Sequence, residues 1–391
     1  MQLRYNVNFN KTVQRQQTYH INSCHRTRFQ ARSITSYKTQ QRLTKDDKMT
    51  KASNALLIGD FAPLHLGHLA DINHAAGIAE TLHIVITPPI KRPLPSGRTA
   101  NLQDVARWVQ VACQQFGFIK VHTTQSLGLD IAFDYQQDAR LDDGQFSQVC
   151  QALAIDTTST QVYQANLDTD LRSQRMAICQ HPLQHFDQLA PACCYFYTQT
   201  VCIVGGESSG KTTLIHKLAN HYGANIALEM GRLYAHSHLG GTELGLQYSD
   251  YLPIAINHAK AIMDATAHAT APITLIDTDF ATTQAFCEVY ENRTHPVVAS
   301  LADHFRADFT IYLDNNVMWV ADGMRRLGDT KARSHFAQTL LDILTRHDIH
   351  HHVIDDADYH ERYQQAISWI DTQILGKTPT ILTQRPQDTT L

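Results

Sequence analysis

Long hydrophobic runs and paired cysteines are both missing from this sequence. No stretch of eighteen consecutive apolar residues occurs, so we expect no helix that spans a membrane. The eight cysteines are scattered, no C-x-x-C motif is present, and Cys202 lies inside an apolar run. This pattern favours reduced thiols in a cytoplasmic protein over disulfide bonds or a zinc site. The histidines at 350–352 have no carboxylate at ligand spacing and read as a solvated or strand-edge cluster, with metal binding as the alternative.

Positive charge is scarce outside the first fifty residues. Residues 1–50 hold ten Lys or Arg and two Asp, whereas the rest of the chain holds 23 basic and 35 acidic residues, a net charge of −12. This acidic body gives no global signature of nucleic-acid binding, and nucleic acid is not expected as a partner. We expect residues 1–50 to be a disordered extension before a natural start at Met49. A targeting peptide and a DNA-binding arm are the alternatives.

The strongest motif is VCIVGGESSGKTTL at 201–214. An apolar strand leads into G-x-x-x-x-G-K-T and then into a helical pattern, which is the arrangement of a phosphate-binding loop. Glycines let the backbone turn its N–H groups toward an anion, and the following helix adds its positive end. Lys211 is expected to reach the β- and γ-phosphates of ATP, and Thr212 to hold Mg²⁺. The expected nucleotide-binding residues are Gly205, Gly206, Glu207, Ser208, Ser209, Gly210, Lys211, Thr212 and Thr213.

Strands and helices alternate on both sides of this loop, which predicts parallel sheets with ligands at the carboxyl ends of the strands. The buried strand Pro272–Ile276 ends at Asp277, where a P-loop enzyme holds Mg²⁺ through water. The segment Trp319–Arg333 is basic. Its Arg325, Arg326, Lys331 and Arg333 either close over a triphosphate or form a solvated basic helix.

A second motif, GDFAPLHLGH at 59–68, follows a predicted strand at Ala55–Ile58. Two histidines three residues apart at a helix start can hold phosphate oxygens through their N–H groups, although each alone reads as an ordinary helix-start histidine. The string G-x-F-x-P-x-H-x-G-H resembles the signature of the nucleotidyltransferase superfamily. The resemblance points to binding by Gly59, Phe61 and Gly67 and to catalysis by His65 and His68.

We therefore predict an α/β protein with two parallel-sheet domains. Residues 51–195 are expected to form a Rossmann-like nucleotidyltransferase domain and residues 198–376 a P-loop kinase domain, with a tail at 377–391. Further strands are predicted at Leu82–Thr87, Phe118–His122, Asn225–Leu228, Phe309–Leu313 and His352–Ile354, and helices at Leu102–Phe116, 211–221, 251–268 and 359–375. No elements are placed at 125–160, and 183–200 has the composition of a linker.

With two nucleotide motifs in one chain, the sequence resembles the bifunctional NadR-type enzymes, in which nicotinamide mononucleotide adenylyltransferase is fused to ribosylnicotinamide kinase. The likeness covers roughly residues 52–376. Besides the two motifs it rests on LGG…LQYSDY at 239–251, IDTDFATTQAFC at 276–287 and NN…WVADGMRRLG at 315–328.

The resemblance implies two reactions. The C-terminal half would transfer the γ-phosphate of ATP to nicotinamide riboside, and the N-terminal half would join the resulting mononucleotide (NMN) to AMP from ATP, giving NAD and pyrophosphate. It assigns Lys211 to the phosphates, Asp277 and Thr212 to Mg²⁺, and Asp279 or Glu229 to the ribose hydroxyl. Arg232 and Arg325 would stabilise charge. Homo-oligomerisation is left open.

Three departures from the family pattern leave alternatives. The arginine and serine of the adenylyltransferase string I-S-x-x-x-x-R fall on Cys179 and Gln174, although Arg172 or Arg175 could substitute. Leu228 and Met230 replace two aromatic residues of W-E-Y-G-R. No helix-turn-helix is evident in residues 1–50. A kinase with a weak or nucleotide-sensing first half, and an NAD-responsive regulator, are the competing interpretations.

Overall fold

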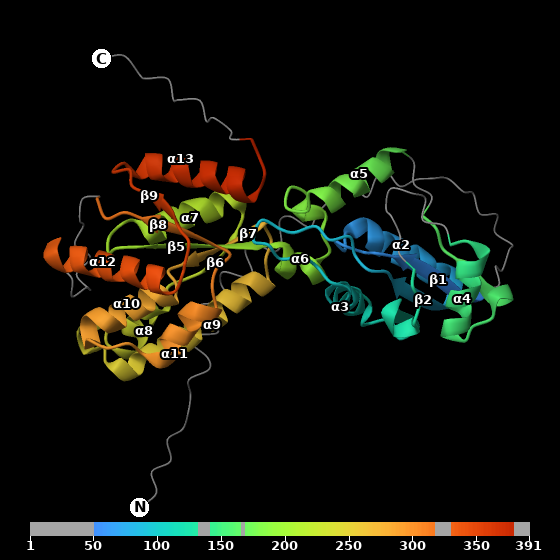
Figure 1. The fold of residues 1–391 in the computed structure, drawn as a ribbon, viewed down its shortest axis with the longest axis horizontal. Helices are drawn as coiled ribbons and strands as arrows, with labels where there is room; N and C mark the ends of the chain where they lie inside the picture. The colour runs from blue at the N-terminus through green and yellow to red at the C-terminus, as the bar shows by residue number, and fades with distance from the viewer. Residues whose placement is uncertain (1–50, 132–140, 166–168, 317–329, 379–391) are drawn as a thin grey trace, which may run out of the picture. The chain divides into compact units, whose positions relative to one another are not determined.

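The computed structural model describes residues 51–131, 141–165, 169–316 and 330–378. Within them the chain forms two separate parallel β-sheets, each with helices packed on its faces (Figure 1). The expected α/β class with two parallel sheets is therefore confirmed. The extension at 1–50, Arg325 with the rest of 317–329, and the tail from residue 379 lie outside the described residues.

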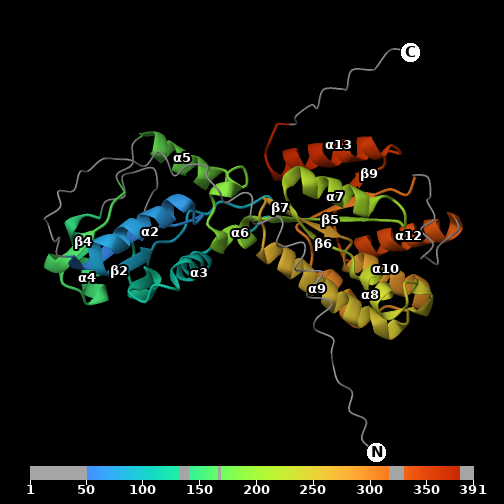
Figure 2. The ribbon, with the colours of Figure 1, turned by 180° about the vertical axis from the view of Figure 1, so that it is seen from behind.

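The first sheet has the strand order β3-β2-β1-β4, and all neighbouring strands are parallel. In Figure 2, α2 lies across the strands of this sheet, and it packs on β1 and β2. The strands are β1 (Ala52–Gly59), β2 (Ala79–Ile86), β3 (Ile119–Thr123) and β4 (Thr160–Val162). The helices are α2 (Leu66–Ile78), α3 (Leu102–Cys113), α4 (Asp143–Leu153), α5 (Thr169–Gln180) and α6 (Pro191–Tyr197), with 3₁₀ turns η1 (Gln125–Leu127), η2 (Thr157–Ser159) and η3 (Phe186–Gln188).

Residues 183–197, which the sequence assigned to a linker, fold against the first half instead. They form η3 and α6, and their apolar side chains Phe186, Cys193 and Tyr197 are buried. Trp108 of α3 is fully buried against this segment, where its Nε1 donates to Tyr195 Oη at 3.2 Å. The linker interpretation fails because a segment that contributes buried aromatic side chains belongs to a core.

The second sheet has the order β6-β7-β5-β8-β9, again with all neighbours parallel. Its strands are β5 (Gln199–Gly205), β6 (Asn225–Ala227), β7 (Ile273–Asp277), β8 (Phe309–Leu313) and β9 (His352–Ile354). Its helices are α7 (Lys211–Tyr222), α8 (Met230–His238), α9 (Tyr251–Ala267), α10 (Phe280–Glu291), α11 (Pro296–His304), α12 (Thr330–Arg346) and α13 (Tyr359–Trp369), with η4 (Glu243–Gly245), η5 (Tyr248–Asp250) and the π-turn η6 (Ile370–Ile374).

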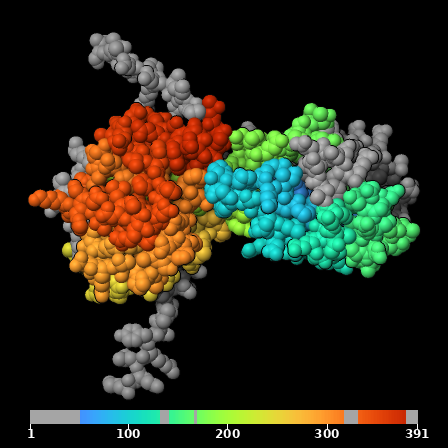
Figure 3. All heavy atoms as spheres, in the orientation of Figure 1, coloured from blue at the N-terminus to red at the C-terminus, as the bar shows by residue number. Residues whose placement is uncertain are grey.

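The apolar run of β5 is continuous because both faces of this sheet are covered. Val201 and Ile203 belong to the buried cluster that includes α7 and α13, whereas Cys202 and Val204 belong to the cluster of α9, α10 and α12. Figure 1 shows α7 and α13 on one face of the sheet and α9 and α10 on the other. In the space-filling view, atoms of the C-terminal segments cover the strands of this sheet on the side that faces the viewer (Figure 3).

The structure also supplies elements that the sequence did not reveal. The weakly patterned stretch from 125 to 160 contains η1, α4 and η2 within its described part, and β4 begins at its end. Asp142 caps α4 through a capping box with Gln145, so local polar signals define this helix rather than a strong apolar stripe. None of the helices in the described parts of the chain combines the length and apolar character that a membrane crossing requires.

Replacing Trp108 with Ala should destabilise the protein by about 3–5 kcal/mol, because it removes a fully buried aromatic side chain and leaves a cavity. Arg107→Ala, an exposed position on the same helix, is the control and should change stability by less than about 0.5 kcal/mol. Thermal unfolding followed by circular dichroism tests this. Equal unfolding temperatures for the two variants would show that residues 183–197 do not form part of the core.

Candidate active sites

The phosphate loop connects β5 to α7, and its backbone path requires glycine at residue 210. Gly210 has φ +88°, and a Cβ atom there would lie 2.7 Å from Cε1 of Tyr359. Lys211 opens α7 and its Nζ donates to the carbonyls of Gly205 at 3.0 Å and Gly206 at 2.8 Å. The lysine thus lies within the loop, at the positive end of α7, where a bound anion is stabilised.

Asp277 at the end of β7 lies beside this loop. Thr212 Oγ1 donates to Asp277 Oδ2 at 2.9 Å, and Asp277 Oδ1 is buried without a hydrogen-bond partner among the described residues. Burial raises the pKa of Asp277, and the charge of Glu229 adds to that effect. The Thr212 hydroxyl and the Asp277 oxygen that accepts no hydrogen bond fit Mg²⁺, which prefers oxygen ligands and retains several waters. No group of three or more His, Cys, Asp or Glu in the described residues has a metal-binding arrangement.

The two carboxylates proposed for the ribose hydroxyl have different surroundings. Asp279 Oδ1 caps α10, accepting from Thr282 N and from Thr282 Oγ1, each at 2.8 Å. Glu229 precedes α8 without capping it, and its side chain faces a pocket. Its charge also acts on Asp277, as does that of Arg232 from the first turn of α8. Glu229 is therefore the carboxylate that remains available to a ligand.

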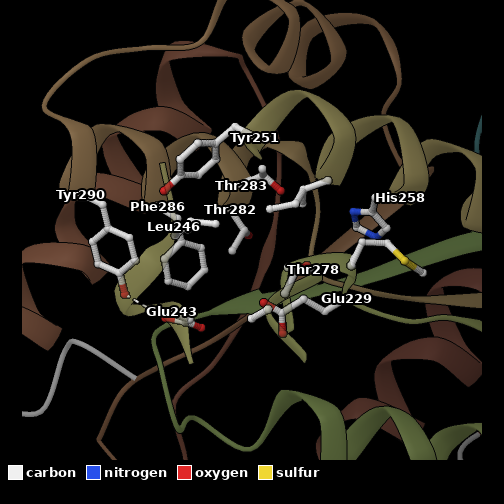
Figure 4. Close-up of a pocket in the computed structure, with 14 residues that line it drawn as sticks. Glu229, Glu243, Leu246, Tyr251, His258, Thr278, Thr282, Thr283, Phe286 and Tyr290 are labelled. Carbon is white, nitrogen blue, oxygen red and sulfur yellow. Dashed lines mark hydrogen bonds between the residues drawn. The ribbon is translucent and has the colours of Figure 1, made fainter. Parts of the chain in front are cut away.

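The pocket beside Glu229 is formed by α8, α9 and α10, and about 530 Å³ within it is not occupied by protein atoms. In Figure 4, Tyr290 and Phe286 lie at one end of the pocket and His258 at the other, with Glu229 and Thr278 along one edge. Its lining consists of Glu229, Met230, Gly231, Ala235, Glu243, Leu246, Tyr251, Ile254, His258, Thr278, Thr282, Thr283, Phe286 and Tyr290.

The polar groups of this pocket favour a flat ligand with positive charge. Burial lowers the pKa of His258 to about 4, so its imidazole is neutral at physiological pH, and its Nε2 has no partner among the described residues. Tyr290 Oη donates to Glu243 Oε2 at 3.2 Å. Among the lining residues that the structure describes, two are carboxylates and none is Lys or Arg. Aromatic faces and carboxylates together attract a cationic ring.

Four basic residues were considered as a cover for a triphosphate. Arg325 and Arg326 lie outside the described residues, and Lys331 is exposed. Arg333 neither covers a triphosphate nor lies in solvent. It is 8% exposed, and its Nη2 donates to the carbonyl of Glu207 at 3.2 Å and to Asn315 Oδ1 at 2.7 Å. It supports the phosphate loop from behind. Sequence reasoning missed this contact because 126 residues separate the two groups.

In the first half, the two motif histidines lie together at the start of α2. His65 Nδ1 accepts from the backbone N–H of His68 at 3.3 Å, and the two rings stack with centroids 3.6 Å apart. Burial lowers the pKa of His65 to about 3, so its neutral ring carries the proton on Nε2, which has no partner among the described residues. A Cβ at Gly67 would lie 2.9 Å from His65 Cε1, which explains the glycine between them.

The string at 173–179 lies on α5 and brings one guanidinium to these histidines. Arg175 forms an ion pair with Asp71 at 2.5 Å, and its Nη2 donates to the carbonyl of Gly67 at 3.3 Å. Cys179 is 2% exposed, whereas Gln174 points into solvent. Of the two arginines that could substitute, Arg175 therefore lies beside the histidines, and its guanidinium is paired with Asp71.

Asp60, an unassigned position within the first motif, changes the electrostatics of this site. It is 1% exposed, and neither carboxylate oxygen makes a hydrogen bond of good geometry with the described residues. Burial raises the pKa of Asp60 to about 6, and the nearby backbone of Ala62 and the charge of Arg92 offset this only in part. Its charge also acts on Cys179, so it lies close to the place where the family pattern has an arginine. Ionised Asp60 repels a phosphate there.

Comparison with known proteins identifies relatives along most of the chain. A family model described as an AAA domain matches residues 200–362. The trifunctional NAD biosynthesis/regulator protein NadR of Salmonella typhimurium is 33% identical over 340 residues, covering 81% of this chain and 82% of the relative. The protein of the same name from Escherichia coli is 32% identical over 345 residues, covering 82% of this chain and 83% of the relative.

Two solved structures share the fold at 18% identity, and each match covers 85% of this chain and 99% of the other. One is a NadR protein in complex with NR, with a TM-score of 0.65, and the other is a NadR protein in complex with NAD and AMP-PNP, with a TM-score of 0.63.

Asp60→Asn should stabilise the protein at pH 7–8 and have little effect near pH 3. The folded-state pKa of about 6 lies above the ordinary value of 3.8, so ionising Asp60 in the folded protein costs about 3 kcal/mol above pH 6. This cost disappears as the pH falls below 3.8, where Asp60 is protonated in the unfolded chain too. Urea unfolding at pH 3, 6 and 8 measures the change in stability, with exposed Asp130→Asn as the control. A gain that is equal at all three pH values would contradict the assignment.

Proposed function

Because the chain belongs to the NadR family, we propose that its second half is a kinase that phosphorylates nicotinamide riboside with ATP to give NMN. The observation that carries the proposal is the position of Glu229, whose side chain faces the pocket while its charge acts on Asp277 beside the phosphate loop. The curated relatives are named NAD biosynthesis/regulator proteins, and this reaction supplies an NAD precursor.

The geometry supports direct transfer from ATP to the riboside. The loop N–H groups, Lys211 and the α7 N-terminus hold the phosphates. Glu229 accepts the proton of the 5′-hydroxyl as its oxygen attacks the γ-phosphorus, the bond from that phosphorus to the bridging oxygen breaks, and ADP leaves. Thr212 and Asp277 are the residues that would hold Mg²⁺, which when bound offsets phosphate charge. Nicotinamide riboside carries its positive charge on a flat aromatic ring, which matches the carboxylates and aromatic faces of the pocket.

For the first half we propose adenylyl transfer to NMN that is much slower than the kinase reaction. The neutral His65 and His68 at the start of α2 suit phosphate oxygens. Three features weaken the binding of a triphosphate. Cys179 stands where the family pattern has an arginine, Arg175 is paired with Asp71, and the carboxylate of Asp60 is buried nearby.

The first test supplies ATP, Mg²⁺ and nicotinamide riboside and separates NMN and NAD by chromatography. We expect NMN to accumulate with little NAD. Lys211→Ala should abolish NMN formation while leaving conversion of added NMN unchanged, and His68→Ala should remove only the NAD. Exposed Lys260→Ala is the control for loss of a lysine. Absence of both NMN and NAD with the wild-type protein would refute the kinase, and conversion of NMN to NAD as fast as NMN forms would refute the weak first half.

A second test separates the two carboxylates. Glu229→Gln should lower kcat about 10²–10⁴-fold, because the amide cannot accept the hydroxyl proton. Asp279→Asn should keep kcat within a few-fold, since Asn is also a good helix cap for α10. Both are near-isosteric, so steady-state rates can be compared at equal concentrations of folded protein. The opposite ranking would make Asp279 the base.

A further inference from the structure

Arg333 and Arg362 share a buried pattern of contacts around the phosphate loop. Arg362 of α13 is 2% exposed, and its Nη1 donates to the carbonyl of Ser209 at 2.8 Å. Arg333 of α12 is 8% exposed and donates to the carbonyl of Glu207. Each guanidinium therefore holds one backbone carbonyl of the loop, and the two carbonyls are two residues apart.

Both arginines also contact the chain immediately after β8. Arg333 Nη2 donates to Asn315 Oδ1 at 2.7 Å, and Arg362 Nη2 donates to Asn316 Oδ1 at 2.5 Å and to the carbonyl of Asp314 at 2.9 Å. Arg362 Nε donates further to the carbonyl of Asp356, just after β9. The two side chains thus join the phosphate loop to the ends of β8 and β9, which come from distant parts of the sequence.

This arrangement bears on how the loop binds an anion. In a peptide unit the C=O and N–H point in opposite directions, so fixing the carbonyls of Glu207 and Ser209 on the protein side turns the N–H groups of the following residues toward the open side. Two buried cations behind the loop also raise the potential felt by a phosphate. Glu207 and Ser209 are both buried, and a buried backbone acceptor is stabilised by a donor.

We propose that Arg333 and Arg362 are positioning residues for the ATP phosphates: they fix the orientation of the phosphate-loop backbone without touching the substrate. The inference rests on the proposed kinase function only in taking ATP as the ligand of the loop. It adds Arg362, which lies outside every motif that pointed to that function, and it gives Arg333 a different role from the cover over a triphosphate that the sequence suggested. Because they act on the loop rather than on the nucleoside pocket, their loss should affect one substrate and leave the other nearly unchanged.

The test is steady-state kinetics of the kinase reaction with each substrate varied in turn. Arg333→Met and Arg362→Met should each raise KM for ATP about 10-fold or more, while KM for nicotinamide riboside changes less than about 2-fold. Loss of folded protein lowers the apparent kcat but leaves both KM values unchanged, so a merely structural role gives a different result. Arg333→Lys and Arg362→Lys keep the charge and one donor, and should restore part of the ATP affinity.

Arg306 offers a matched control. It also donates to backbone carbonyls, those of Ala302 and Asp348, but neither belongs to the phosphate loop. Arg306→Met should therefore leave both KM values unchanged. An unchanged KM for ATP in the Met variants, or in the Lys variants if the Met variants do not fold, would overturn the proposal. So would an equal rise in Arg306→Met. A wild-type protein that forms neither NMN nor NAD from nicotinamide riboside would instead refute the kinase function itself.

Discussion

The two halves of this molecule differ in how their buried charged side chains are hydrogen-bonded. In the second half, Arg333 and Arg362 direct their donors to backbone carbonyls of the phosphate loop, and Thr212 donates to the buried Asp277. In the first half, the buried carboxylate of Asp60 has no comparable donor among the described residues. In each half a helix N-terminus that suits an anion follows a strand of the sheet, and in the second half two buried arginines also hold the loop that precedes this helix.

Much of the fold followed from local patterns. The strands that pack on both faces read as apolar runs, and the phosphate loop and the histidine motif each gave a strand, a turn and a helix where the structure has them. Segment 183–197 was predicted as a linker because nothing in its own sequence indicates that its aromatic side chains pack against Trp108. Single-sequence patterns report periodicity, whereas this packing joins residues 87 positions apart.

The sequence predicted the residues of the two sites only in part, for a similar reason. Spacing rules identify groups such as Lys211 and Thr212, which must sit at fixed offsets to reach one ligand. Arg362 contacts Ser209 across 153 residues, and no local pattern encodes such a pair. Tyr251 and Phe286 lay inside strings that suggested the family, but their place in the pocket became visible only with the packing of α9 against α10. They supply aromatic faces where Leu228 and Met230 do not.

The first half also has a physical role that does not depend on its catalytic strength. One buried cluster contains Trp108 and Tyr197 together with Val201 and Ile203 of β5. Arg98 donates to the carbonyl of Thr198 at 2.6 Å and to Asp308 Oδ2 at 2.9 Å, and the same oxygen accepts from the backbone N–H of Thr200 at 2.8 Å. These contacts fix the start of the strand that ends in the phosphate loop. The core of the first half therefore supports the position of the phosphate loop, whether or not its own site holds a triphosphate.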